Sequence, residues 1–263
     1  MTQVRVGVAG AGGRMGQEVC RAVAAQDDLV VAAAIDPYHA GVPIADTAGI
    51  ESDVSIAPTN DALVAASVDV LVDFTHLDAA RDNLHFCADA GIHAVVGTSG
   101  FTTDDHAAIA SRFTSSNCVI APNFAIGAVL LMRFAELAAP YFETGEIIEL
   151  HHDGKVDAPS GTAINTAERM AAASSEWADD PTETETIAGA RGAQGAGNIP
   201  IHSVRMRGMT AHQEVVLGTT GQSLNLRHDS YDRSSFMPGV VLAVRRIADT
   251  PGLTVGLDGM LDL

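Results

Sequence analysis

Residues 149–163 combine proton-transfer groups with an anion-binding element; they read Glu-Leu-His-His-Asp-Gly-Lys-Val-Asp-Ala-Pro-Ser-Gly-Thr-Ala. His151, His152 and Lys155 can exchange protons, and their positive charges suit a carboxylate or phosphate ligand. The segment follows an apolar run, 145–150, that predicts a strand, and it leads into an alanine-rich run that predicts a helix. The start of a helix presents backbone N–H groups that favour anions. The pattern therefore predicts an anion site coupled to proton transfer.

Lys155 is the only lysine of the chain; the other 14 of its 15 lysine and arginine side chains are arginines. Lysine changes its protonation state when its surroundings shift its pKa, whereas arginine keeps its charge. A lone lysine beside two histidines therefore favours a chemical role. Two structural alternatives remain: His151 as a hydrogen-bonded core residue at a strand end, and Asp157 as a turn residue before a proline.

A second pattern occupies the start of the chain, where a strand-like run, 4–9, leads through glycines into a helical run. The glycine segment reads Gly10, Ala11, Gly12, Gly13, Arg14, Met15, Gly16. Glycines allow a tight turn and let a pyrophosphate approach the backbone, and the helix start supplies N–H donors. Asp36, 20 residues after Gly16, ends the next strand-like run and could accept hydrogen bonds from ribose hydroxyls. The combination predicts a nicotinamide dinucleotide site; the alternative is a tight turn with a carboxylate capping the second strand.

The chain of 263 residues carries 33 acidic and 15 basic side chains, a net charge of −18 that argues against a nucleic-acid partner. The acid excess fits adaptation to high salt, and equally ordinary solubility in a GC-rich coding background. Cys20, Cys87 and Cys118 show no metal or disulfide spacing, so we expect buried free thiols, no metal site and a reducing compartment. Without a signal-like start or an apolar run near the ~20 residues of a membrane span, a cytoplasmic, soluble protein is expected.

Residues 1–122 alternate between apolar and alanine-rich runs, which predicts a Rossmann-like doubly wound parallel sheet. The predicted strands are 4–9, 29–35, 68–74, 93–96 and 118–121, and the predicted helices 15–25, 61–66, 77–90 and 103–113. The loops that follow the strands should meet at one edge of the sheet and line the nicotinamide end of the cofactor. They contain Phe74, Thr75, Gly97, Thr98, Ser99, Ala121, Pro122, Asn123 and Phe124. The alternative is ordinary turn chemistry, with Thr75 and Thr102 as helix caps.

The pattern changes after Pro122, where a second α+β domain with a mixed or antiparallel sheet is expected. Its predicted elements are a helix over 124–139, with Ile126, Leu130, Phe134 and Leu137 on one face, strands at 146–151, 200–205, 214–218 and 223–227, and a polar loop over 174–197. A helix over 236–248 and a short tail over 253–263 end the chain. We expect a dinucleotide-binding domain, 1–122, on which 233–263 folds back, and a substrate-binding and oligomerisation domain, 123–232.

These segments together resemble the 4-hydroxy-tetrahydrodipicolinate reductase (dihydrodipicolinate reductase) family of bacterial lysine and diaminopimelate biosynthesis. The resemblance rests on segments that span most of the chain in the family's order. They are Val8–Gly16, Asp73–Thr75, Gly97–Phe101, Ala121–Phe124 and, most specifically, His151–Ala163. The family resemblance implies an NADH- or NADPH-dependent reductase acting on a small dicarboxylate ring, and a homotetramer built through the second domain.

The resemblance also implies roles for individual residues. His151 and Lys155 would be the acid–base pair, residues 10–16 would hold the pyrophosphate and Asp36 the adenosine ribose. The substrate carboxylates would be held by His152, Ser160, Gly161 and Thr162, with Ser99 and Lys155 nearby. The nicotinamide half would lie against 74–75, 97–99 and 121–124, and Arg233 would reach the cofactor from the domain hinge. Two departures from the family are the serine at 99, often threonine, and Asp153-Gly154, where some members carry basic residues.

Cofactor preference and rival functions follow from the same residues. Asp36 is followed by Pro37, without an adjacent arginine for a 2′-phosphate, so NADH should serve at least as well as NADPH; Arg14 and His39 leave dual use open. An aspartate-semialdehyde dehydrogenase would need a nucleophilic cysteine in the second domain, and none follows Cys118. A dinucleotide-sensing protein and another imine or enone reductase on the same fold remain as alternatives.

Overall fold

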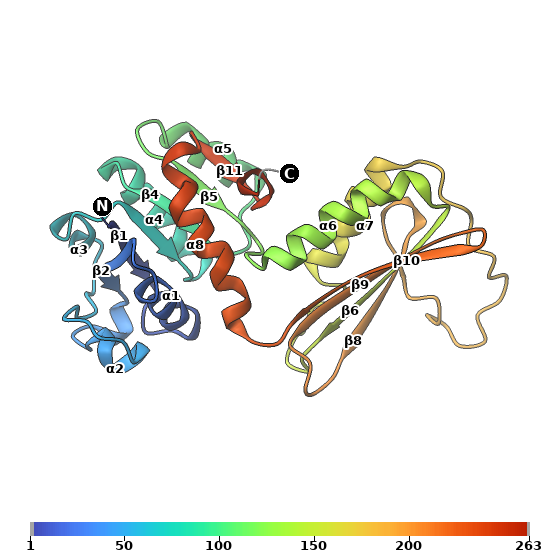
Figure 1. Ribbon diagram of the computed structural model, residues 1–263, viewed down its shortest axis with the longest axis horizontal. Helices are drawn as coiled ribbons and strands as arrows, with labels where there is room; N and C mark the ends of the chain where they lie inside the picture. Colours follow the sequence, from blue (N-terminus) through green and yellow to red (C-terminus); the bar gives the residue numbers. More distant parts are fainter. Residues whose placement is uncertain (1–2, 262–263) are drawn as a thin grey trace. The chain divides into compact units, whose positions relative to one another are not determined.

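The computed structural model describes residues 3–261. The chain forms two compact units: one contains the residues up to Ala125 together with those from Arg233 onward, and the other is Ile126–Asp232 (Figure 1). We refer to them as the first and the second unit. Each has its own sheet and its own hydrophobic core.

The first unit is built on a six-stranded parallel sheet in the order β11-β5-β4-β3-β1-β2. Its strands are β1 Val4–Ala9, β2 Leu29–Ile35, β3 Val70–Asp73, β4 His93–Val96, β5 Cys118–Ile120 and β11 Leu253–Val255. The predicted tail thus supplies a sixth strand, which pairs with β5 from Leu253↔Cys118 onward. Three residues at a sheet edge are too few to show an alternating pattern, so this strand was missed.

Helices cover both faces of the first sheet (Figure 1). Leu71 and Val96 of the sheet pack with Leu84 and Ile109 on one face, whereas α1 and α8 contact each other and the strands on the opposite face. The helices are α1 Arg14–Ala24, α2 Ile44–Ala48, α3 Asp61–Ala65, α4 Leu77–Ala90, α5 Thr103–Arg112 and α8 Met237–Arg246. A parallel sheet buried on both faces explains why its strands are continuously apolar.

Of the two threonines considered as helix caps, only Thr102 has that role. Its hydroxyl accepts from the Asp105 N–H at the start of α5, and the Asp105 carboxylate accepts from the Thr102 N–H in return. At α4 the cap is the His76 side chain, and the Thr75 hydroxyl donates instead to Asp73 at 2.7 Å. The cap interpretation of Thr75 was therefore wrong, because the strand-end carboxylate takes its hydroxyl.

The second unit contains a mixed sheet in the order β10-β9-β6-β8-β7, with α6 Ile126–Ala138 and α7 Gly161–Ala173 packed on one of its faces (Figure 1). Its strands are β6 Thr144–His151, β7 Ala193–Gln194, β8 Pro200–Arg205, β9 Ala211–Thr219 and β10 Gln222–Ser230. β6 is parallel to β8 and antiparallel to β9. Together with the parallel sheet, this confirms the predicted fold class. The segment predicted as a polar loop, 174–197, contributes the short strand β7.

The buried face of α6 differs from the face that its large residues suggested. Phe134 and Leu137 are 46% and 53% exposed, and the buried residues are Ala128, Val129, Leu131, Met132 and Ala135. Because α6 is apolar almost all round, its pattern could not decide which side faces the sheet. The buried face combines two alanines with three larger apolar residues. None of the helices within residues 3–261 is both long and apolar enough to cross a membrane.

Candidate active site

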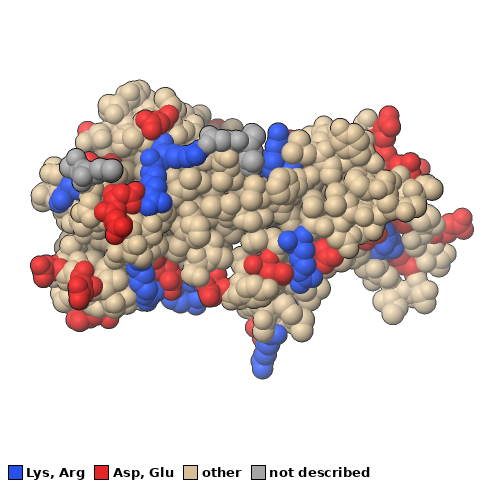
Figure 2. All heavy atoms as spheres, viewed as in Figure 1, with Lys and Arg blue, Asp and Glu red and all other residues tan. Residues whose placement is uncertain are grey.

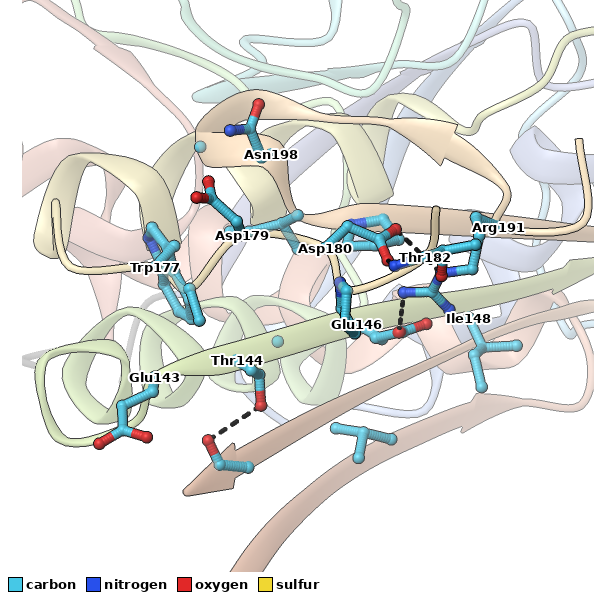
Figure 3. A pocket seen from close by; sticks show the side chains of 18 residues that line it. Glu143, Thr144, Glu146, Ile148, Trp177, Asp179, Asp180, Thr182, Arg191 and Asn198 are labelled. Carbon is cyan, nitrogen blue, oxygen red and sulfur yellow. Dashed lines mark hydrogen bonds and ion pairs between the residues drawn. The ribbon is translucent and has the colours of Figure 1, made fainter. Parts of the chain in front are cut away.

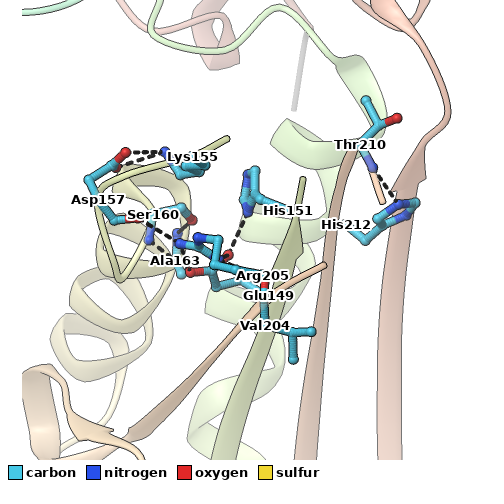
Figure 4. A network of polar contacts seen from close by, with 10 residues as sticks. All are labelled: Glu149, His151, Lys155, Asp157, Ser160, Ala163, Val204, Arg205, Thr210 and His212. Atoms are coloured by element: carbon cyan, nitrogen blue, oxygen red, sulfur yellow. Dashed lines mark hydrogen bonds and ion pairs between the residues drawn. The ribbon is translucent and has the colours of Figure 1, made fainter. Parts of the chain in front are cut away.

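Glu149 lies at the centre of a buried polar network at the end of β6 (Figure 4). Its side chain is fully buried, and its two carboxylate oxygens each accept a hydrogen bond of 2.8 Å from the Arg205 guanidinium. Arg205 is the last residue of β8, the parallel neighbour of β6. Such a two-pronged ion pair fixes both side chains in the plane of the contact.

His151 is held by the same carboxylate, through a contact of 2.5 Å between its Nδ1 and Oε2 of Glu149. An ionised carboxylate only accepts hydrogen bonds, so Nδ1 carries the proton and Nε2 is the nitrogen for proton exchange. Burial lowers the pKa of His151, and the positive charges of Lys155 and Arg205 lower it further, against the opposing hydrogen bond to Glu149. The imidazole is thus oriented, and its neutral form is favoured.

The pKa of Glu149 is itself lowered, in spite of its burial. Burial alone raises it, but hydrogen bonds from Arg205, Ser203 and His151 together lower it by more. Glu149 therefore stays an anion beside the imidazole. Neither Glu149 nor Arg205 was among the site residues predicted from the sequence. The alternation of side chains along a strand could have indicated Glu149, because residues 149 and 151 of one strand point to the same face and Glu149 is therefore a neighbour of His151.

Lys155 pairs with Asp157 rather than with His151. Its ammonium donates to both carboxylate oxygens of Asp157, at 2.9 and 2.7 Å, and this hydrogen bond is the main cause of the lowered pKa of Asp157. Asp157 is thus a partner of the lysine as well as a loop residue. Lys155 and His151 nevertheless lie at the same end of β6 (Figure 4), and His152, which is exposed, shares a turn with Lys155.

Ser160 links this network to the start of α7. Its hydroxyl accepts from the Ala163 N–H at 3.2 Å as the helix cap, and its own N–H donates to Glu149 at 3.2 Å. The Ser160 hydroxyl is therefore the cap of α7, and the part of Ser160 in holding a substrate carboxylate stays a prediction. Gly161 and Thr162 are the first two residues of α7, at the helix end whose dipole favours an anion.

The glycine segment of the first unit has the shape that a dinucleotide requires. Gly10 has a φ of +73°, and a Cβ on it would lie 3.0 Å from the Phe74 carbonyl oxygen. A Cβ on Gly16 would lie 2.1 Å from the Gly10 carbonyl oxygen, so any side chain there would separate α1 from β1. The α1 helix begins at Arg14 without a side-chain cap, which leaves its N-terminus open to an anionic ligand. These residues fit a nicotinamide dinucleotide.

Asp36 lies beside the glycine segment and is largely buried. Its carboxylate accepts from the Gly12 N–H at 3.1 Å and from the Tyr38 N–H at 2.9 Å, and it contacts His39 Nδ1 at 3.0 Å. A cavity of about 530 Å³ opens next to it, lined among others by Gly10, Gly13, Asp36, Tyr38, Phe74 and Thr75. The structure thus brings the glycine segment, Asp36 and the loop after β3 together around one cavity.

The loops predicted to face the nicotinamide pack on one another. The Phe74 ring lies so close to Gly97 that a Cβ there would be 2.0 Å from the ring, and its centroid is 5.8 Å from that of Phe124. Thr98, Ala121 and Phe124 are buried, Asn123 is half-buried and caps its own loop, and Ser99 and Pro122 are exposed. Arg233 is exposed at the start of a 3₁₀ turn that packs against α1.

A second cavity, of about 600 Å³, lies in the second unit near the start of β6 (Figure 3). Its walls include Trp177, Asp179, Thr182 and the ion pair between Arg191 and Glu146, whose contact measures 2.6 Å. Arg191 also reaches Asp180 at 3.0 Å and so fastens the 174–197 segment to β6. None of the predicted site residues lines this cavity.

The charged side chains on the face shown in Figure 2 are interspersed rather than gathered. Ion pairs such as those of Arg245 with Asp28 and Arg207 with Asp153 join neighbouring groups of opposite sign. This face therefore offers no continuous basic track of the kind that follows a phosphate backbone.

Comparison with known proteins gives one consistent family. Residues 4–124 match the family model described as dihydrodipicolinate reductase, N-terminus, and residues 127–261 match dihydrodipicolinate reductase, C-terminus. Proteins named 4-hydroxy-tetrahydrodipicolinate reductase are 49% identical in Mycobacterium sp. (strain KMS), over 99% of this chain and 100% of theirs, and 47% identical in Corynebacterium urealyticum (strain ATCC 43042 / DSM 7109), over 99% of each.

A solved structure agrees with these sequence matches. The dipicolinate-bound dihydrodipicolinate reductase from Paenisporosarcina sp. TG-14 superposes with a TM-score of 0.87 at 39% identity, over 99% of this chain and 100% of that one. The chain therefore shares both its sequence and its fold with these reductases over 99% of its length.

Proposed function

This chain belongs to the dihydrodipicolinate reductase family, and we propose on that premise that it reduces 4-hydroxy-tetrahydrodipicolinate to tetrahydrodipicolinate, with loss of water, in lysine and diaminopimelate biosynthesis. The observation that carries the proposal is the His151 site. An oriented imidazole, the lone lysine and the N-terminus of α7 lie around the end of one strand. A dicarboxylate ring that must be held and protonated matches these groups. The name of the Paenisporosarcina protein, bound to dipicolinate, supports a ligand of this class.

The residues of the second unit would hold the substrate and deliver protons. Gly161, Thr162 and His152 would bind the carboxylates, since a helix start and an imidazole both favour anions. Protonated His151 would donate the proton on Nε2, while Nδ1 keeps the proton that it shares in its hydrogen bond to the Glu149 carboxylate. Lys155, the other member of the acid–base pair, would use its ammonium to stabilise the negative charge that develops on the ring. When bound, the nicotinamide supplies the hydride. The whole dinucleotide would be held by residues 10–16, Asp36 and the loops after β3, β4 and β5, with Arg233 adjacent.

The assay is the substrate-dependent oxidation of NADH, followed by its near-ultraviolet absorbance, on addition of the freshly made product of dihydrodipicolinate synthase. We expect turnover by the unaltered protein and none by the double variant His151→Ala/Lys155→Ala. Binding of NADH by calorimetry with no turnover would contradict the proposal. That result would point to a dinucleotide sensor, or to another imine or enone reductase.

We expect NADH to be used at least as well as NADPH, because the Asp36 carboxylate would repel a 2′-phosphate. In Asp36→Asn, kcat/KM with NADPH relative to NADH should rise about tenfold, since a nearby unit charge is removed. The control is Asp53→Asn, an exposed acid of the same unit, which should leave the ratio unchanged. A hundredfold preference of the unaltered protein for NADPH would refute the expectation. His39, in contact with Asp36, is the neighbouring group that permits dual use.

The second unit would also assemble a homotetramer, in a cytoplasmic setting. The sheet face opposite α6 and α7 carries the partly exposed apolar residues Ile148, Leu150, Val204 and Val216, and such a face favours a partner. The three buried free cysteines suit a reducing compartment. Sedimentation equilibrium should give four chains per particle; a monomer at micromolar concentration would argue against this assembly.

A further inference from the structure

Asp73 is a buried carboxylate at the central strand end of the first unit. It is the last residue of β3 and is only 1% exposed. In register it pairs with Ala9 of β1 on one side and Val96 of β4 on the other. It thus lies between the glycine segment and the Gly97–Thr98 loop, at the point where strand order reverses and α/β proteins bind ligands.

The partners of Asp73 are neutral groups. Its Oδ1 accepts from the Thr75 N–H at 2.9 Å, the Thr75 hydroxyl at 2.7 Å and the Thr98 hydroxyl at 3.1 Å. Its Oδ2 accepts from the Asn83 amide at 2.7 Å. In every one of these contacts the partner group donates and the carboxylate accepts, and an ionised carboxylate can only accept. Within residues 3–261, no ion pair brings a cation to Asp73.

The same carboxylate accepts hydrogen bonds from two loops, and under the proposed function both loops contact the cofactor. Thr75 and Thr98 are both anchored to its Oδ1, and the Thr98 hydroxyl also lies 3.3 Å from the Thr75 carbonyl oxygen. Removal of Asp73 would therefore loosen both loops. It would also remove a negative charge from a buried position, where charges act more strongly than in water.

We propose that Asp73 is a positioning residue whose buried charge favours the oxidised over the reduced nicotinamide. This inference rests on the proposed function, because it takes the loops of Thr75 and Thr98 to hold the nicotinamide. Oxidised nicotinamide carries a positive charge that the reduced ring lacks. A buried anion with neutral partners leaves a negative potential at this sheet edge, and that potential stabilises the cationic ring. Hydride donation is thereby made more favourable.

The test is the ratio of the Kd values for NAD⁺ and NADH, measured by calorimetry without substrate. In Asp73→Asn the ratio Kd(NAD⁺)/Kd(NADH) should rise roughly tenfold, since a buried unit charge is lost. Asp69→Asn is the matched control: it removes the same charge from an exposed residue just before the opposite end of β3 and should leave the ratio unchanged. A loss of loop anchoring alone would raise the Kd values for NAD⁺ and NADH together and leave the ratio of the two unchanged.

A second variant separates charge from folding. Asp73→Asn/Asn83→Asp moves the carboxylate to the other member of the same hydrogen-bonded pair, where the Asn60 amide, now 2.8 Å from Asn83 Oδ1, still donates to it. It should keep the ratio within about threefold of the unaltered protein, because the charge stays in the same buried cluster. If Asp73→Asn does not fold, Asp73→Ser replaces it as the neutral variant.

The outcomes are distinct. An unchanged ratio in a folded neutral variant overturns the inference, as does a double variant whose ratio matches that of the neutral one. If the unaltered protein binds neither nucleotide, the proposed function itself fails. A raised ratio in the neutral variant, with both controls as stated, establishes the electrostatic role of Asp73.

Discussion

Replacing His151 or Lys155 with alanine should lower kcat by about 10²–10⁴-fold, the usual contribution of a positioned proton donor or acceptor. The Kd for NADH should stay unchanged, because the cofactor-binding residues proposed above belong to the first unit. His151 offers one oriented nitrogen, and Lys155 is the only ammonium side chain of the protein. Stopped-flow or steady-state oxidation of NADH, with calorimetry for Kd, measures both quantities.

Two control variants sharpen this prediction. Arg207→Ala removes a cation whose side chain is 94% exposed and pairs with Asp153, in the loop that contains Lys155, and should leave kcat unchanged. Lys155→Arg keeps the positive charge, but a guanidinium does not give up its proton near neutral pH, so this variant separates charge stabilisation from proton transfer. If Lys155→Arg keeps full activity, the lysine acts through charge alone and its place in the acid–base pair is refuted.

The pKa of His151 gives a second readout of the same pair. Lys155 lowers it, so Lys155→Ala should raise it, as seen by NMR titration of the imidazole. If protonated His151 is the donor, kcat/KM of the free enzyme falls as pH rises through this lowered pKa. In Lys155→Ala, whatever activity persists should decline at a higher pH. An unshifted imidazole would show that Lys155 lies too far from His151 to couple with it in solution.

Glu149→Ala should destabilise the protein by about 3 kcal/mol or more, because it leaves the Arg205 guanidinium without its buried partner. The Glu149 side chain is fully buried, and that of Arg205 is 19% exposed. Denaturant unfolding measures the loss. Removal of the carboxylate also frees Nδ1 of His151, so kcat should fall even under conditions in which the variant is folded.

A double variant distinguishes stability from function. Glu149→Leu/Arg205→Met replaces the whole ion pair by apolar groups and should recover most of the lost stability. It should not recover kcat, because the imidazole still lacks its anchor. Glu146→Gln is the matched control on the same strand: Glu146 also joins an arginine and a histidine, but it is 35% exposed and should cost less than about 1 kcal/mol. Full kcat in the apolar double variant would remove Glu149 from the mechanism.

The buried Glu149 carboxylate should also make the free energy of unfolding depend on pH. The folded-state pKa of Glu149 is lowered, so its contribution is present above the unfolded-state pKa and is lost as pH falls through the folded value. The unaltered protein should therefore lose stability more steeply in acid than the apolar double variant. Equal acid slopes would show that other carboxylates govern acid unfolding.

The sequence by itself determined the fold class, because apolar runs alternate with alanine-rich runs over residues 1–122 and this pattern changes after Pro122. The strands of the first unit are buried on both faces and so are continuously apolar. Gly10 and Gly16 lie so close to other backbone atoms that a side chain at either position would clash. The residues 151–163 were also recognisable, since a lone lysine, two histidines and a helix start fall within one segment. Residues that lie close together in the sequence can be recognised as a site without knowledge of the tertiary structure.

Only the tertiary structure decided which groups face one another. Arg205 reaches Glu149 because β6 and β8 are parallel neighbours, and a partner 56 residues away leaves no local pattern. The structure also decided that Lys155 pairs with Asp157 and which face of α6 packs on the sheet. Asp73 shows the same limit. Its sequence position marked a strand end, but its burial among four neutral donors depends on two loops and the helix α4, which only the folded sheet brings together.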